Sequence, residues 1–99
     1  MLQAQIFIDL EDMKGDQSLH DYLIKFLAER NVAGATSFMG YAGFGKHHKI
    51  KNPRELFSFD EPPAMILFID EVEKVRKIVA ELKTVIPGKV IFLLNAEIA

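Results

Sequence analysis

Two short runs of this chain contain only apolar residues: residues 64–69, Ala-Met-Ile-Leu-Phe-Ile, and residues 90–94, Val-Ile-Phe-Leu-Leu. Runs of this kind without polar positions are typical of strands that are covered on both faces. Neither run approaches the roughly 20 apolar residues that a membrane span needs, so we expect no integral membrane segment. The chain is therefore expected to fold around a sheet whose two faces both exclude water.

The other strands are indicated by period and by glycine. In residues 2–9, Leu2, Ala4, Ile6 and Ile8 alternate with the residues between them. This period of two is typical of a strand, which places one set of side chains on each face. Residues 35–41 can extend as a further strand, which we expect to begin after Gly34 ends the preceding helix. Gly40 within this strand indicates a bulge or a close backbone approach.

Two segments carry the spacing of amphipathic helices. The first runs from about residue 19 to residue 30, and Ser18 with Asp21 at its start resembles a capping pair. The second has its apolar stripe over residues 72–82, and Asp70 is the expected cap. Together with the strands, these helices give the order βαββαβ.

This order predicts an α+β fold, the ferredoxin-like sandwich, in which two helices cover one face of a four-stranded antiparallel sheet. A length of 99 residues predicts a single domain over residues 1–99. The second face of the sheet stays open, and the runs 64–69 and 90–94, together with Phe7, make it apolar. We therefore expect another copy of the chain to cover it.

Composition excludes several classes of function. The absence of cysteine excludes disulfides, thiolate metal sites and a cysteine nucleophile, and it favours the cytoplasm. A net charge of -2 excludes general attraction to nucleic acid. No pattern of serine, histidine and carboxylate residues predicts an active site, so we expect a protein that is not an enzyme.

The segment from Gly40 to Lys46, Gly-Tyr-Ala-Gly-Phe-Gly-Lys, places three glycines and a lysine after a strand. Glycines let backbone N–H groups converge on an anion, and lysine supplies charge for phosphate. A flexible hinge is the alternative interpretation, because no helix follows as the known phosphate motifs require. The segment also resembles an RNA-recognition submotif, but Gly43 interrupts that pattern and the segment follows the wrong strand, so no nucleic-acid partner is expected.

A basic run follows the glycines. The segment 46–54 has no acidic residue before Glu55, and it is either a solvated loop or an exposed arm that reads an acidic ligand or partner. His47 and His48 are adjacent, which is a poor spacing for chelating one ion, and no third ligand lies nearby in sequence. We therefore predict no metal site.

The letters Gly34-Ala35-Thr36, Gly40 and Gly43-Phe44-Gly45 occur in this order before a histidine-containing segment. In this respect the chain resembles the PII-like signalling superfamily, most closely its bacterial branch of PII-like domains of unknown function. The resemblance implies a homotrimer that binds adenine nucleotides in clefts between subunits. It also implies a loop, residues 46–60, that docks on a partner protein whose identity the sequence does not reveal.

The same resemblance implies roles for individual residues. The nucleotide-binding residues would be Thr36, Gly43, Phe44, Gly45, Lys46, Gly88 and Lys89, with Thr36 facing the adenine. The partner or effector loop would include His47, His48, Lys49, Lys51 and Arg54. His47 stands where PII carries a glutamine used with magnesium and 2-oxoglutarate, and the arginine-bearing segment that clamps phosphates in PII has no counterpart before Ala99. ADP or AMP is therefore the expected ligand, and no cofactor is required.

An alternative function is that of a trimeric divalent-metal-responsive protein, because the ion-tolerance family is a similar trimer of this topology. The glycines before Lys46 favour the nucleotide, whereas His47 and His48 favour the metal.

Overall fold

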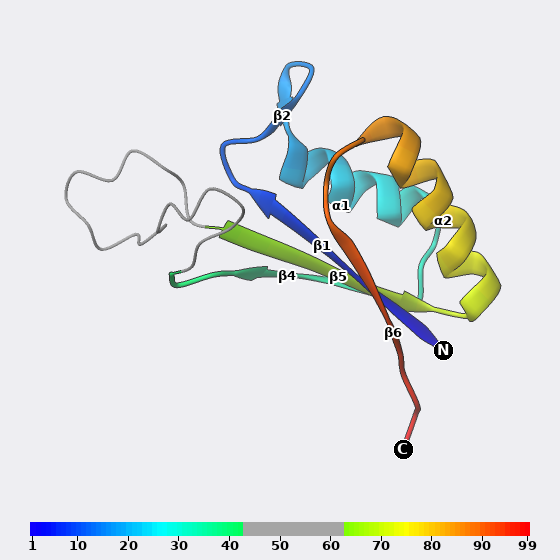
Figure 1. Ribbon diagram of the computed structural model, residues 1–99. Coiled ribbons are helices and arrows are strands. Elements are labelled where there is room, and N and C mark those ends of the chain that lie inside the picture. The colour runs from blue at the N-terminus through cyan, green and yellow to red at the C-terminus, as the bar shows by residue number, and fades with distance from the viewer. Residues whose placement is uncertain (43–62) are drawn as a thin grey trace.

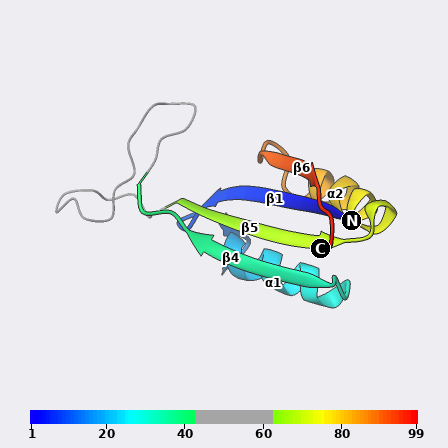
Figure 2. The same ribbon diagram turned by 90° about the horizontal axis from the view of Figure 1, so that it is seen from below.

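A computed structural model of the protein describes residues 1–42 and 63–99. Its principal strands are β1 (Leu2–Asp9), β4 (Gly34–Met39), β5 (Pro63–Asp70) and β6 (Ile91–Asn95), and its helices are α1 (Leu19–Glu29) and α2 (Val72–Val85). The strands form one antiparallel sheet in the order β4-β5-β1-β6. Both helices cover the same face of this sheet, as Figures 1 and 2 show from two directions. The fold is the predicted ferredoxin-like βαββαβ sandwich.

The hydrophobic core lies between the helices and one face of the sheet. Every second residue of β1 and of β5 is buried there, as the pleat of a strand dictates. Ile6 pairs with Ile66 and Ala4 with Phe68 across these two strands, and all four side chains have no exposed area. The apolar stripes of the helices complete this core with Leu19, Leu23, Phe26, Leu27, Val75, Ile78, Val79 and Leu82.

Both ends of α1 are set by polar backbone contacts. As predicted, Ser18 is the N-cap, and its Oγ accepts a hydrogen bond from the Asp21 N–H at 3.1 Å. The expected role of Gly34 as the residue that ends the helix is wrong. Arg30 is the C-cap and Asn31 takes the left-handed backbone conformation with φ 53°, whereas Gly34 is the first residue of β4. Asparagine tolerates this conformation better than most residues, and that allows it to replace glycine here.

Asp70 is not the cap of α2 as the sequence pattern suggested, because it is the last residue of β5 and the N-cap is Glu71. The Asp70 carboxylate still accepts the Glu71 N–H at 2.7 Å, and it also accepts the Ala33 N–H at 3.0 Å. The Lys74 ammonium lies 3.0 Å away. Asp70 thus joins the end of β5, the segment before β4 and the first turn of α2.

A short hairpin between β1 and α1 was not predicted. It consists of β2 (Met13–Lys14) and β3 (Gln17–Ser18), and Gly15 makes its turn with φ 62°. Two-residue strands carry too few positions for a periodic pattern, so the sequence pattern indicated only a polar turn in this place. Figure 1 shows the hairpin projecting beside the start of α1.

Gly40 makes the predicted close backbone approach. Its N–H donates to the Pro63 carbonyl oxygen at 2.6 Å, and a Cβ at this position would meet Pro63 Cγ at 2.8 Å. β4 therefore ends and β5 begins at one fixed contact, whatever residues connect them. None of the helices in the described ranges is long and apolar enough to cross a membrane.

Candidate functional site

The face of the sheet away from the helices carries apolar side chains on all four strands. These exposed and half-buried side chains are Phe7, Phe38, Met65, Leu67, Ile69, Phe92 and Leu94, and the polar residues Gln3, Gln5 and Thr36 lie among them. Phe7 and Phe92 pack edge to face with their ring centroids 5.7 Å apart, and they remain 42% and 53% exposed. Figure 2 views the sheet from this side, with the helices behind it. Apolar surface of this extent is characteristic of a contact with another molecule.

Thr36, the residue expected to face the adenine, lies on this open face. It is in β4, an edge strand, and it pairs with Leu67 of β5, which pairs in turn with Gln5 of β1. The Thr36 side chain is exposed. A planar ligand could therefore rest against the edge of the open face at Thr36.

Lys89, an expected phosphate contact, lies at the opposite edge of the sheet. It precedes β6 and follows Gly88, whose φ of 87° lies in the left-handed region that favours glycine. The Lys89 ammonium is 2.5 Å from the Asp12 Oδ2, in the turn between β1 and β2. Its side chain is thus directed to this turn, just before the short hairpin.

Thr36 and Lys89 are therefore separated by two central strands within one chain. At a spacing of about 4.8 Å between strands, the two edge strands lie roughly 14 Å apart. Thr36 lies on the open face, whereas the Lys89 side chain contacts the turn between β1 and β2, so the two side chains do not converge on one site within a single chain. Two copies placed with the β4 edge of one beside the β6 edge of the other would bring such residues together.

The other expected site residues lie outside the described residues. These are the phosphate residues Gly43, Phe44, Gly45 and Lys46 and the loop residues His47, His48, Lys49, Lys51 and Arg54. Their assignments remain predictions. Gly40 and Pro63 do fix the points at which this part of the chain leaves β4 and enters β5.

A cluster of serine, histidine and aspartate that sequence reasoning missed joins α1 to β4. His20 Nε2 lies 2.7 Å from Ser37 Oγ, and His20 Nδ1 lies 3.0 Å from Asp21 Oδ1. The histidine hydrogen bond lowers the pKa of Asp21, and Ser18 contributes to the same shift. Asp21 is 76% exposed, so water screens its charge, unlike the buried aspartate of a serine hydrolase triad. The cluster is best described as a tether between the helix and the edge strand.

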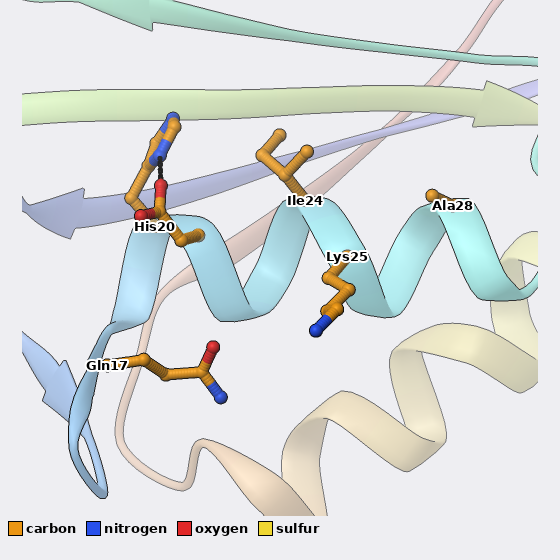
Figure 3. Close-up of a pocket in the computed structure, with 6 residues that line it drawn as sticks. Gln17, His20, Ile24, Lys25 and Ala28 are labelled. Carbon is orange, nitrogen blue, oxygen red and sulfur yellow. Dashed lines mark hydrogen bonds and ion pairs between the residues drawn. The ribbon is translucent and has the colours of Figure 1, made fainter.

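A shallow hollow of about 380 Å³ lies along α1. It is lined by Gln17, His20, Asp21, Ile24, Lys25 and Ala28. In Figure 3 the Ile24 and Lys25 side chains point in different directions from the helix, and His20 stands at one end. The polar groups do not converge on one point, so this hollow defines no ligand class.

Within residues 1–42 and 63–99, no group of three or more His, Asp or Glu side chains is placed to hold a metal ion.

Sequence comparison places the chain in a family. The family DUF190, described as "Uncharacterized ACR, COG1993", matches residues 1–98, and the chain belongs to it. A relative called "UPF0166 protein", from Aquifex aeolicus (strain VF5), is 29% identical over 79 residues, which cover 80% of this chain and 75% of the relative.

Solved structures similar to this chain include PII-like proteins. CPII, a nitrogen regulatory PII-like protein from Thiomonas intermedia K12 bound to ADP, AMP and bicarbonate, matches with a TM-score of 0.68 and 16% identity, over 99% of this chain and 93% of CPII. The divalent ion tolerance protein CutA1 from Ehrlichia chaffeensis matches with a TM-score of 0.63 and 12% identity, over 99% of this chain and 82% of CutA1. At these identities the similarity shows the shared fold. It confirms the predicted PII-like fold, and the DUF190 match agrees with the predicted branch of domains of unknown function.

Proposed function

We propose that this protein is a PII-like binding and signalling module of the cytoplasm that forms a homotrimer. Each cleft between subunits binds an adenine nucleotide, ADP or AMP. The open apolar face would form the interior of the trimer. The function is binding and not catalysis, and it requires no cofactor.

The observation that carries this proposal is the position of Thr36 and Lys89 at opposite edges of the sheet. A ring of three copies uses one kind of contact three times, and it places the β4 edge of each copy next to the β6 edge of its neighbour. An adenine at Thr36 of one copy then lies near the phosphate-binding turn at Lys89 of the next. The ADP and AMP bound by CPII, a protein of the same fold, support this choice of ligand.

The segment 46–60 would communicate nucleotide binding to a partner protein. Its assignment rests on the resemblance to PII-like proteins, since these residues lie outside the described ranges. Amide exchange over residues 49–59, measured with and without ADP, tests this part of the proposal. Identical protection in both states would leave a nucleotide-binding protein without a signal in this segment.

Nucleotide binding is tested by calorimetric titration of the full chain with ADP and with adenosine. Replacement of Lys89 by Ala is expected to weaken ADP binding roughly ten-fold, because a charge-assisted hydrogen bond to phosphate is lost. Adenosine binding should be nearly unchanged. Lys83→Ala, at an exposed position of α2, is the matched control. Equal losses for both ligands, or no binding of ADP to the unmodified chain, would contradict the proposal.

The divalent-metal alternative rests on His47 and His48 and on the fold shared with CutA1. Titration of the same protein with Zn²⁺ or Cu²⁺ distinguishes it from the nucleotide function. Saturable metal binding that is lost in a His47→Ala/His48→Ala double variant, without ADP binding, would favour the alternative.

A further inference from the structure

The contact between Lys89 and Asp12 opposes the ligand that Lys89 is expected to bind. The Lys89 ammonium and Asp12 Oδ2 are 2.5 Å apart, and the two side chains are 31% and 22% exposed. The Lys89 ammonium that a phosphate would need is therefore already paired with the Asp12 carboxylate. A phosphate that approaches Lys89 also approaches the Asp12 charge.

Asp12 is held in this position by its own backbone contacts. Its N–H donates to the Asp9 carbonyl oxygen at 3.0 Å, and its carbonyl oxygen accepts the Leu19 N–H at 2.8 Å. The Asp9 N–H donates to the same Oδ2 that contacts Lys89, at 3.0 Å. The carboxylate is thus fixed at the end of β1, while Lys89 reaches it through a flexible side chain.

The short hairpin that follows Asp12 is also fixed, because it contacts the end of α2. The Lys14 ammonium donates to the Val85 carbonyl oxygen at the end of α2, at 2.8 Å, and lies 5.8 Å from the Tyr22 ring centroid. The chain at residues 12–14 therefore makes two contacts with the end of α2 and the segment after it, Lys14 with Val85 and Asp12 with Lys89. Asp12 cannot move away from a ligand without a change in the hairpin that follows it.

We infer that Asp12 is a specificity-determining residue that makes this site favour adenine nucleotides with few phosphate charges. This inference rests on the proposed nucleotide function. Bound phosphate must share Lys89 with Asp12 and is repelled by the Asp12 carboxylate. The free-energy cost of this repulsion rises with each negative charge on the ligand. It is therefore absent for adenosine, small for AMP and larger for ADP and ATP.

Asp12→Asn tests this inference, because asparagine keeps an oxygen that can accept the Asp9 N–H but removes the charge. Calorimetric titration at low salt should show unchanged affinity for adenosine. The affinity should rise roughly two- to three-fold for AMP, about five-fold for ADP and more for ATP, as expected for removal of a repulsive charge at partly screened distance. These gains should shrink as the salt concentration increases.

Asp16→Asn is the matched control, since Asp16 is an exposed residue of the same hairpin. This substitution should leave the affinities for adenosine, AMP, ADP and ATP unchanged. A loss of ADP affinity in Asp12→Asn would overturn the inference, because it would mean that Asp12 positions Lys89 for phosphate. An equal change for adenosine and ADP would also overturn it, because a structural effect does not depend on ligand charge.

A measurement on the unmodified chain keeps the inference testable if Asp12→Asn fails to fold. During titration with ADP, the backbone amide resonances of Asp9 and Asp12 should shift together with that of Lys89, because all three depend on the shared contact. Shifts at Lys89 without shifts at Asp9 and Asp12 would overturn the inference while nucleotide binding stands. If neither the unmodified chain nor Asp12→Asn binds ADP, the proposed function fails and the inference fails with it.

Discussion

The two faces of the sheet differ sharply although the same strands form both. On the face under the helices, Ile6, Ile66 and Phe68 have no exposed area. On the open face, Phe7 and Phe92 are 42% and 53% exposed. The open face is therefore not a solvated surface of the usual polar kind, and its apolar side chains are available to bind another molecule. The difference shows that the helices decide which apolar positions become core.

The largest effect is expected from loss of a side chain on the covered face. Phe68→Ala should destabilise the fold by about 3–5 kcal/mol, because it removes a fully buried ring and leaves a cavity. Chemical denaturation monitored by circular dichroism measures this change. Phe92→Ala is the matched control on the open face. A similar loss of subunit stability for both variants at high dilution would contradict the distinction between the faces.

The second prediction concerns the open face as an interface between copies. Leu67 lies in β5 between Thr36 of β4 and Gln5 of β1, near the centre of this face. Leu67→Lys places a charge there that would have to be buried unpaired in an assembly, so the chain should dissociate at micromolar concentration. Light scattering should report about 34 kDa for three unmodified chains of 11.2 kDa each, and a single chain for the variant.

Ala80→Lys adds the same side chain at an exposed position of α2 and should leave the assembly intact. A stable species of 11.2 kDa for the unmodified chain at this concentration would show that the open face is not the interface proposed above.

A smaller effect is expected at Gly40, where the junction of β4 and β5 lacks room for a side chain. Gly40→Ala places a Cβ 2.8 Å from Pro63 Cγ and 3.1 Å from the Pro63 carbonyl oxygen, so the junction of β4 and β5 must shift. We expect a loss of about 1–3 kcal/mol in chemical denaturation, as for other overpacked positions. Gly34→Ala, whose Cβ would meet Ile69 Cγ2 at an ordinary 3.7 Å, should change stability much less. Equal losses would show that the contact with Pro63 is not the cause, because the reduced entropy of the unfolded chain favours the fold in both variants.

The smallest effect is expected at Asp70, the only buried charged residue in the described part of the chain. The Glu71 N–H, the Lys74 ammonium and the Ala33 N–H hold its pKa below the usual value. A depressed pKa stabilises the fold above the unfolded pKa of about 3.9, and this contribution is lost as the pH falls through the folded pKa. Asp70→Asn should therefore be less stable than the unmodified chain at pH 7, and the difference should shrink below about pH 4.

Thermal unfolding at pH 7 and at pH 3 measures this difference. Glu73→Gln removes an exposed carboxylate from the same helix and serves as the control. A difference for Asp70→Asn that is the same at both pH values would mean that its cause is packing and not charge.

Local patterns were sufficient for most of the fold. The alternation of residues 2–9, the helical stripes and the Ser18 cap each depend on neighbours within a few residues, and the structure confirms them. The runs 64–69 and 90–94 predicted strands and an apolar open face, because no polar position interrupts them. The approach of Gly40 to another backbone segment was also predicted, although Pro63 as its partner was not.

The candidate site was predictable only in part. Thr36 and Lys89 were singled out through a family resemblance, but their places at opposite edges of the sheet follow from the strand order. The contact of Lys89 with Asp12 joins residues 77 positions apart, and the contact of His20 with Ser37 joins residues 17 apart. No periodic pattern in the sequence predicts such pairs, because side chains distant in sequence meet only when helices and strands have packed.

The sequence by itself determined the order of the four principal strands and the two helices, the ends of α1 within a residue or two, and the apolar character of both faces of the sheet. These properties follow from local spacing and from side-chain polarity, which are fixed before the chain folds. Only the tertiary structure decided which residues of β5 and β6 face the helices and that the Asp12 carboxylate lies against Lys89. Those outcomes depend on packing among distant segments, where burial and electrostatic contacts are settled together.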